Sequence, residues 1–319
     1  MDGPGIEIQL LGTAGPRGWP EPDCRCSSCT RMRAARRRVE PTRVLLDGVP
    51  LDQCRRCQVP GGYDVRTPRG HRVLFAARPG ARPEPAAPEP YDAVLLDLIG
   101  DPSHLGRLRR AGAVTDATRI EAVHVDHRIP SPAELDRRMS LWTRPAPGPW
   151  RSLILGGARS GKSEEAELRV MTHPEVTYVA TGIMHGDDPE WRDRIAAHRR
   201  RRPRWWDTAE TIDLAGLLRE SAGTLLIDGM GTWLTAVFDA LGAWEYPQAV
   251  VPRLNELVDA WRSTRAHVVA VSDEVGLSVV PDTASGRAFR DTLGRLNQRL
   301  AAESEETALV VAGRVIDLP

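Results

Sequence analysis

The chain of 319 residues is predicted to form two folded parts, the second an α/β domain whose mostly parallel sheet is flanked by helices. Its length exceeds what one hydrophobic core usually organises. A Pro- and Gly-rich stretch, TRPAPGPW at 143–150, is typical of a linker. Beyond it, apolar runs alternate with segments of helical periodicity. We therefore predict domains over 1–143 and 151–319, joined by a linker over 144–150.

The second half contains five strand-like runs: SLIL, VTYVA, TLLID, HVVAVS and ALVVA. Between them, residues 162–171, 190–200 and 287–302 have helical periodicity. Short β-branched runs separated by helices are typical of strands buried on both faces of a parallel sheet.

The first half is less regular, and we predict a smaller α+β domain. The strand-like runs are IEIQLLGTAG, RVLLDG, HRVLFAA and DAVLLDL. The segment TRMRAARRRV is predicted to form a basic helix. The proline-rich run at 77–91 is expected to be a loop.

Composition excludes several classes of function. The formal net charge is zero, so nothing favours nucleic acid as a partner. No apolar run approaches the roughly 20 residues that span a bilayer, and the start lacks the basic region of a signal peptide. We expect a cytoplasmic protein without a membrane span. The five cysteines all lie in the first 57 residues, a pattern that favours metal binding over disulfides in that compartment.

The segment GGARSGKS at 156–163 fits the phosphate-binding pattern G-x-x-x-x-G-K-[ST] and lies between a predicted strand and a predicted helix. Its glycines let backbone N–H groups surround phosphate oxygens, and the helix N-terminus favours negative charge. Lys162, the sole lysine of the chain, would reach the β- and γ-phosphates, where a compact ammonium fits and a guanidinium does not. Ser163 would bind Mg²⁺. The predicted loop comprises Gly156, Gly157, Ala158, Arg159, Ser160, Gly161, Lys162 and Ser163.

Two further positions suggest phosphate chemistry. Asp228 ends the TLLID run, where a carboxylate on the Mg²⁺ side is expected; the alternative is an aspartate that makes a turn. His198 is followed by four arginines and shares a helix face with Arg194. A neutral imidazole is a competent nucleophile and guanidinium groups stabilise a transferring phosphoryl group. A solvated basic helix end with an incidental histidine is the other interpretation.

Six segments in order, GGARSGKS, YVATG, RIAAHRRRRPRWWDTAE, LLIDGMGTWLT, VSDEVGLSVVP and GRLNQRLA, resemble the bifunctional adenosylcobinamide kinase/adenosylcobinamide-phosphate guanylyltransferase family of cobalamin biosynthesis. The resemblance covers 151–319. It implies that ATP or GTP, with Mg²⁺, phosphorylates adenosylcobinamide. GMP then passes from GTP to adenosylcobinamide phosphate through a covalent GMP–imidazole on His198. It also implies a homo-oligomer, a trimer in relatives. The nucleotide contacts it implies, besides the loop, are Ala180, Thr181, Gly182, Arg199, Arg202, Glu210 and Asp228, the last where some relatives carry glutamate.

The cysteines leave two ligand sets open. CRCSSC supplies Cys24, Cys26 and Cys29, and tetrahedral zinc needs a fourth ligand. Cys26 and Cys29 could pair with Cys54 and Cys57 in a zinc-ribbon-like spacing. Alternatively, the triple cysteine could recruit a histidine from far along the chain.

The segments LGTAG…DCRCSSCTRMRAARRR…LLDG and YDAVLLDLIGDPSHLG…RIEAVHVDHRIPSPAELDRR resemble the two ends of metallo-β-lactamase-fold phosphodiesterases of the phosphonate-utilisation type and their quinone-cofactor-biosynthesis relatives. That resemblance implies a structural zinc on Cys24, Cys26, Cys29 and His127. The T-H-x-H-x-D-H segment of the catalytic metals has no counterpart between 47 and 91, and alanine stands near the place of a bridging aspartate. We therefore predict a truncated metallo-β-lactamase-like zinc module without hydrolytic activity, in which His124 is a relic.

Two alternative functions stay open on sequence alone. The chain could be a generic P-loop small-molecule kinase or NTPase in which His198 lies on a basic face. It could also be a zinc-stabilised interaction protein with a P-loop domain as a switch.

Overall fold

The computed structural model describes residues 5–78, 81–85, 89–144, 148–182 and 200–319. The chain divides into two compact units. The first comprises Met1–Ala146 and Met171–Pro174, and the second Pro147–Val170 and Glu175–Pro319. Among the described helices, none has the length and apolar content that a membrane crossing requires.

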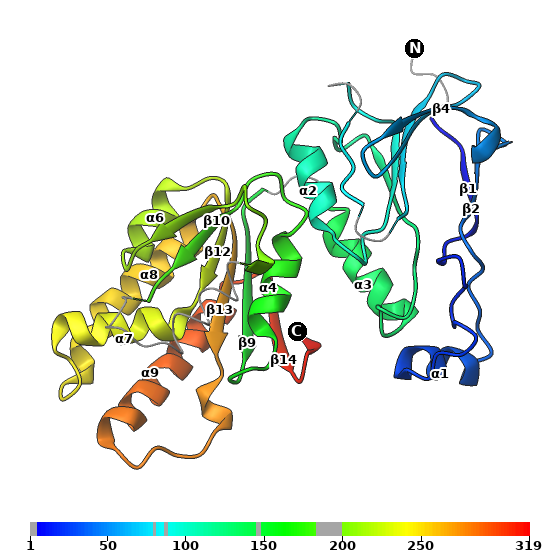
Figure 1. The fold of residues 1–319 in the computed structure, drawn as a ribbon. Helices are drawn as coiled ribbons and strands as arrows, with labels where there is room; N and C mark the ends of the chain where they lie inside the picture. Colours follow the sequence, from blue (N-terminus) through cyan, green and yellow to red (C-terminus); the bar gives the residue numbers. More distant parts are fainter. Residues whose placement is uncertain (1–4, 79–80, 86–88, 145–147, 183–199) are drawn as a thin grey trace. The chain divides into compact units, whose positions relative to one another are not determined.

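The second unit is built on a seven-stranded sheet of order β11-β10-β12-β13-β9-β14-β15 (Figure 1). Every neighbouring pair is parallel except β14 with β15, so only the edge strand β15 runs the other way. The carboxyl ends of the six parallel strands therefore lie along one edge of the sheet, where open α/β sheets bind ligands. The strands are β9 (Trp150–Gly156), β10 (Thr177–Ala180), β11 (Asp207–Glu210), β12 (Thr224–Asp228), β13 (His267–Asp273), β14 (Glu306–Val311) and β15 (Arg314–Leu318).

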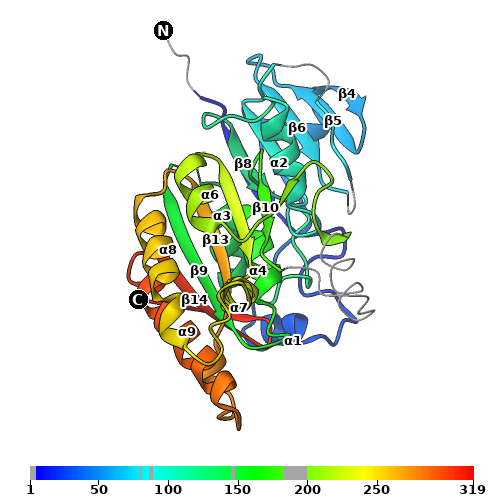
Figure 2. The ribbon, with the colours of Figure 1, turned by 90° about the vertical axis from the view of Figure 1, so that its left-hand side faces the viewer.

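Helices cover both faces of this sheet. Helix α4 packs on one face, and α6 to α9 pack on the other (Figure 2). Side chains alternate along each strand, so Leu153 and Leu155 join the core under α6 to α9 while Ile154 faces the opposite side. The helices are α4 (Lys162–Val170), α6 (Leu214–Glu220), α7 (Met230–Leu241), α8 (Val251–Ser263) and α9 (Ala284–Ala301), with the short turns η2 (Pro247–Val250) and η3 (Val275–Leu277).

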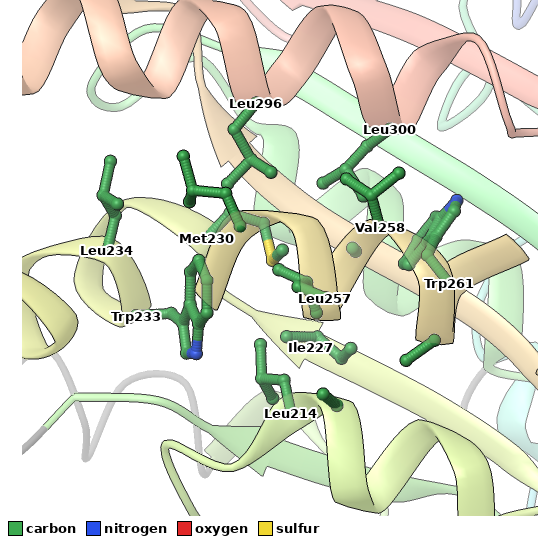
Figure 3. Packing of buried hydrophobic residues seen from close by; sticks show 14 of the residues in the cluster. Leu214, Ile227, Met230, Trp233, Leu234, Leu257, Val258, Trp261, Leu296 and Leu300 are labelled. Carbon is green, nitrogen blue, oxygen red and sulfur yellow. The ribbon is translucent and has the colours of Figure 1, made fainter. Parts of the chain in front are cut away.

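Two fully buried tryptophans fill the core between the sheet and these helices (Figure 3). Trp233 of α7 donates its indole N–H to the carbonyl of Ile212 at 2.9 Å, and Trp261 of α8 donates to Ser304 Oγ at 3.2 Å. Their polar edges are thus satisfied while their rings stay in the apolar cluster, which favours a single packing arrangement.

The first unit contains two sheets that share one apolar cluster. Ile8 and Leu46 come from the three-stranded sheet, and Val65, Val73 and Leu95 from the five-stranded sheet. The larger sheet is antiparallel from β4 to β6 and parallel from β6 to β8. The elements are β1 (Ile8–Gly12), α1 (Ser27–Ala34), β2 (Arg43–Leu46), β3 (Val49–Pro50), η1 (Leu51–Gln53), β4 (Arg55–Val59), β5 (Gly62–Arg66), β6 (Arg72–Ala76), β7 (Ala93–Leu96), α2 (Ser103–Arg110), β8 (Arg119–Ala122) and α3 (Pro132–Trp142).

The predicted strands of both halves are confirmed as β1, β2, β6, β7, β9, β10, β12, β13 and β14, and the helices at 162–171 and 287–302 as α4 and α9. The basic helix predicted from TRMRAARRRV was too long at its C-terminal end. It ends at Ala34 because Arg36 adopts a φ of 50° and Val39 pairs with Trp19. The sequence did not indicate the β4–β5 hairpin or the edge strands β11 and β15. The helix predicted over 190–200 falls almost wholly outside the described residues.

Candidate functional site

The phosphate-binding motif forms the connection between β9 and α4, at the carboxyl edge of the sheet. Gly161 adopts a φ of 98°, which only glycine adopts without strain, and Arg159 a φ of 56°. A Cβ at Gly156 would lie 2.8 Å from the carbonyl oxygen of Val310 in the neighbouring strand β14. Both motif glycines are therefore required by the backbone path. Gly157, Ala158 and Arg159 are exposed at the tip of the loop.

Lys162 begins α4 and bends back over the loop. Its Nζ donates to the carbonyl of Gly157 at 3.1 Å and pairs with Asp273 Oδ1 at 2.9 Å. Asp273 ends β13, the strand directly beside β9. The loop therefore has a carboxylate counter-ion that incoming phosphates would have to displace from the ammonium. We did not predict Asp273, although the aspartate that follows the apolar run HVVAVS was a usable signal.

Asp228 lies at the end of β12 and faces the start of α4. Its Oδ1 accepts a hydrogen bond from Ser163 Oγ at 3.5 Å, and its Oδ2 accepts one from the Tyr178 hydroxyl at 3.2 Å. Burial and the neighbouring Asp228 charge raise the pKa of Tyr178, so the phenol remains a donor to the carboxylate. The guanidinium carbon of Arg202 lies 3.4 Å from the centroid of the Tyr178 ring, a cation–π contact. The structure thus brings Ser163, Asp228 and Arg202 together through a tyrosine that we did not predict.

The neighbouring strand, β10, ends at the predicted position Ala180, and the predicted positions Thr181 and Gly182 follow it directly. Thr181 Oγ1 donates to the carbonyl of Gly229 at 2.6 Å and accepts from its N–H at 3.1 Å, which fixes the turn after Asp228. Glu210 pairs with Ala180 in the register and is exposed at the end of β11. Two predicted residues, His198 and Arg199, lie outside the described residues.

The basic segment that follows them contacts α4. Arg201 Nε donates to Glu167 Oε2 at 2.8 Å, and Arg201 Nη1 lies 3.2 Å from Glu164 Oε1. Burial lowers the pKa of Arg201, but its hydrogen bonds to Glu167 outweigh this, so its pKa is raised. Arg201 is therefore held beside α4, the helix that follows the phosphate loop, by two carboxylates of that helix.

This arrangement provides what nucleotide binding requires: backbone N–H groups at a helix N-terminus, one ammonium, and a hydroxyl beside a carboxylate for a divalent cation. All of them lie at the carboxyl edge of a mostly parallel sheet. The second unit is thus a P-loop nucleotide-binding domain.

A family model described as "Cobinamide kinase / cobinamide phosphate guanyltransferase" matches residues 152–318. The matched segment is just over half of the chain and spans almost the whole second unit. The chain therefore belongs to the cobinamide kinase/cobinamide phosphate guanyltransferase family, whose members are enzymes.

Three curated relatives match the same half. The bifunctional adenosylcobalamin biosynthesis protein CobU of Salmonella typhimurium is 39% identical over 176 residues, which cover 50% of this chain and 95% of that protein. The protein of the same name from Escherichia coli is 37% identical over 174 residues, with the same coverage. Bifunctional adenosylcobalamin biosynthesis protein CobP of Pseudomonas aeruginosa is 38% identical over 168 residues, covering 51% of this chain and 94% of that protein.

The first unit contains a possible metal site. The thiols of Cys24, Cys26 and Cys29 and one ring nitrogen of His127 all lie within 4.8 Å of one another. In a tetrahedral zinc site with Zn–S bonds of about 2.3 Å the sulfur atoms lie roughly 3.8 Å apart, so the donor atoms are within about 1 Å of the spacing that zinc requires. Cys54 and Cys57 belong to no such group among the described residues: the first is buried at the end of η1 and the second is exposed on β4.

Helix α1 positions two of these thiols. Cys26 is its N-cap and its Sγ accepts from the N–H of Cys29 at 3.4 Å. The helix is tied to the segment after His127 by Ser28, whose hydroxyl donates to the carbonyl of Ile129 at 2.8 Å. The N–H of Cys29 lowers the pKa of Cys26, whereas burial raises the pKa of the Cys29 thiol to about 11. Three thiols and an imidazole nitrogen that converge on one point form a ligand set that zinc prefers, which favours a metal in this position.

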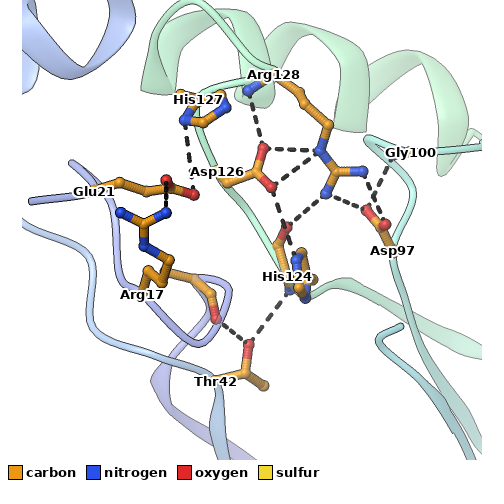
Figure 4. Close-up of polar contacts among 10 residues, drawn as sticks. Arg17, Glu21, Thr42, Asp97, Gly100, His124, Asp126, His127 and Arg128 are labelled. Atoms are coloured by element: carbon orange, nitrogen blue, oxygen red, sulfur yellow. Dashed lines mark hydrogen bonds and ion pairs between the residues drawn. The ribbon is translucent and has the colours of Figure 1, made fainter. Parts of the chain in front are cut away.

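A second polar cluster lies near His127, and in it the charges of two carboxylates are neutralised by an arginine of the same chain (Figure 4). Arg128 Nη1 and Nη2 donate to the two oxygens of Asp97, each at 3.0 Å, and its Nε donates to Asp126 Oδ1 at 2.8 Å. Burial opposes the charge on Arg128, but its bonds to Asp126 and Asp97 raise its pKa. Both carboxylates are therefore bound to a guanidinium, and within the described residues they form no metal-ligand group.

Substituting Asp228 by asparagine is expected to lower kcat/KM of the phosphorylation about 10- to 100-fold and to raise the Mg²⁺ concentration needed for half-maximal rate. The amide keeps the shape and the bond from Ser163 but loses the charge beside the cation. Steady-state rates over a Mg²⁺ titration measure this. Tyr178→Phe is the control, since it removes one donor and keeps the carboxylate. An unchanged Mg²⁺ dependence in Asp228→Asn would contradict this assignment.

Proposed function

We propose that the chain phosphorylates adenosylcobinamide and then converts the product to a GDP derivative. In the first step the substrate hydroxyl oxygen bonds to the γ-phosphorus of ATP or GTP. The bond from that phosphorus to the β,γ-bridging oxygen breaks, the nucleoside diphosphate leaves and the hydroxyl proton goes to solvent. Lys162 and the loop N–H groups stabilise the charge on the β- and γ-phosphates.

The second step uses His198 as a nucleophile. Its neutral imidazole nitrogen bonds to the α-phosphorus of GTP and pyrophosphate leaves. A phosphate oxygen of adenosylcobinamide phosphate then bonds to the same phosphorus, the P–N bond breaks, and the imidazole is released. Arg199 and Arg202 would stabilise the transferring group. Arg201, three residues after His198, pairs with Glu164 and Glu167 of α4, which supports a place for this segment beside the loop.

Ser163 and Asp228 would hold Mg²⁺, which neutralises charge on the phosphates when it is bound. Ala180 to Gly182 and Glu210 would contact the nucleotide from the ends of β10 and β11. The hydroxyl–carboxylate pair and the carboxyl-edge position of each residue support these roles.

The observation that carries the proposal is the family match over 152–318, combined with a phosphate loop whose lysine and serine each face a carboxylate. A generic P-loop kinase would share the loop, but its sequence would not be expected to match this family over the whole of residues 152–318.

GTP labelled at the α-phosphate tests the covalent step. We expect the full chain, with Mg²⁺, to retain acid-labile label after denaturation, because a phosphoramidate on imidazole is acid-labile. GTP labelled at the γ-phosphate is the control and should leave none. A chain that retains no α-label would overturn the guanylyltransferase proposal and favour the simple kinase.

GTP, ATP, adenosylcobinamide and its phosphate are the proposed partners, with no nucleic acid. By analogy with the family we propose a homo-oligomer, a trimer. The five free cysteines are consistent with a reducing cytoplasmic compartment.

For the first unit we propose a structural Zn²⁺ on Cys24, Cys26, Cys29 and His127, in a truncated metallo-β-lactamase-like module over 1–143 that is joined by 144–150 to the enzyme domain at 151–319. The neutralisation of Asp97 and Asp126 by Arg128 supports a module that has lost hydrolysis.

Zinc analysis of single variants tests this ligand set. We expect Cys24→Ser and His127→Ala to lose the bound zinc and to lower the unfolding temperature of the first unit, because metal binding and folding are coupled. Cys57→Ser, an exposed cysteine outside the cluster, is the matched control and should retain zinc. Zinc lost from Cys54→Ser but kept in His127→Ala would instead indicate the zinc-ribbon set.

A further inference from the structure

The first unit contains a cavity of about 620 Å³ that no part of the proposed function uses. It lies at the end of β6, between the β4–β5 hairpin and the segments around Ala14 and Thr42. Its volume falls in the range of sites that enclose small organic molecules. The walls are mainly apolar, with Val59, Phe75 and the ring of Tyr63 among them.

Among the described residues of the cavity wall, Arg78 carries a fixed charge and none is an aspartate or glutamate. The wall also includes His124, whose Nε2 lies 3.8 Å from Asp126 Oδ2. Arg78 is exposed, and its guanidinium makes no hydrogen bond or ion pair with the described residues. An arginine that lines an apolar cavity, and whose five N–H donors bind none of the described residues, is suited to binding an anionic ligand.

His124 is held at the cavity wall at a cost in backbone energy. Its φ of 60° is in the left-handed region, where a residue with a Cβ is strained. Two bonds hold it there: its N–H donates to Thr42 Oγ1 at 3.4 Å, and its carbonyl accepts from Arg128 Nη2 at 3.1 Å. Its ring fits only because residue 15 is glycine, since a Cβ there would lie 2.9 Å from Nε2. A strained backbone conformation that several contacts hold in place is typical of functional positions.

We propose that this cavity binds a small organic carboxylate with an apolar body. The body would fill the space between Val59, Phe75 and Tyr63, and the carboxylate would accept hydrogen bonds from Arg78. A single guanidinium matches a singly charged carboxylate, because two planar N–H···O bonds satisfy both oxygens. A phosphate would carry further charge that the wall does not compensate.

Titration calorimetry of the full, zinc-loaded chain tests the proposal with 3-phenylpropionate and octanoate as probes. We expect saturable binding of at least one, with a dissociation constant of about 1 mM or tighter. The uncharged 3-phenylpropionamide should bind about tenfold more weakly, since it lacks the charge that strengthens the bond to Arg78.

Variants assign the binding to this cavity. Arg78→Gln should weaken binding about tenfold, whereas Arg55→Gln, an exposed arginine on β4 outside the cavity wall, should not change it. Ala77→Trp fills the space and should abolish binding without loss of zinc. The proposal is overturned if neither carboxylate binds, if the amide binds as tightly as the acid, or if Arg78→Gln and Arg55→Gln behave alike. Each result is independent of kinase activity and leaves the proposed function untouched.

Discussion

Replacing Lys162 by alanine is expected to lower kcat/KM of adenosylcobinamide phosphorylation by about a thousandfold. Its ammonium bends back over the loop, whereas the guanidinium of Arg159 is carried at the exposed tip, so the ammonium is placed to neutralise the phosphates as charge develops on them. It also lies only 2.9 Å from Asp273. Without it that carboxylate would face the phosphates uncompensated, so nucleotide binding should weaken as well. Steady-state rates at saturating and limiting ATP separate the two losses.

Lys162→Arg is the informative partner variant. It keeps the positive charge but replaces a compact donor with a planar fork that the loop does not accommodate, so we expect a loss close to that of alanine. Since no other lysine exists in the chain, amine-directed modification adds a second readout. Mg·ATP should protect Lys162 from the reagent. Full activity of Lys162→Arg, or no protection, would show that the ammonium does not contact the phosphates.

Replacing His198 by alanine is expected to reduce GMP transfer about a thousandfold or more and to leave phosphorylation nearly unchanged. Only the second reaction needs a nucleophile on the protein, because in the first the substrate hydroxyl attacks directly. The two activities are measured separately, as formation of adenosylcobinamide phosphate from ATP and as release of pyrophosphate from GTP.

His185→Ala is the matched control, since it removes another histidine from the same stretch of sequence. It should retain both activities. Equal loss of both activities in His198→Ala would point to a folding defect or to a shared structural role, and full retention of GMP transfer would exclude His198 as the nucleophile.

The features predicted well from sequence were local ones. The phosphate loop depends on glycines and a lysine within eight residues, and the buried strands on apolar runs a few residues long. Asp273 was missed because its importance comes from strand order: β13 lies next to β9, although more than 100 residues separate them in the chain. Tyr178 was missed for the same reason, since its link between Asp228 and Arg202 exists only after β10 pairs with β12.

The first unit shows the same limit. Cysteine spacing alone left two ligand sets open, because His127 is about 100 residues from the cysteines and only folding brings it to them. The hairpin of β4 and β5 was not predicted, since RRCQV and GYDVR lack a clear apolar alternation. The end of α1 depends on the pairing of Val39 with Trp19, which no local pattern reveals.

The central claim, that one P-loop domain performs both reactions on a corrinoid, is tested most directly by incubating the full chain with adenosylcobinamide, GTP and Mg²⁺ and identifying the products by mass spectrometry. We expect adenosylcobinamide phosphate to appear first and its GDP derivative to follow. Hydrolysis of GTP with neither corrinoid product formed would contradict the claim.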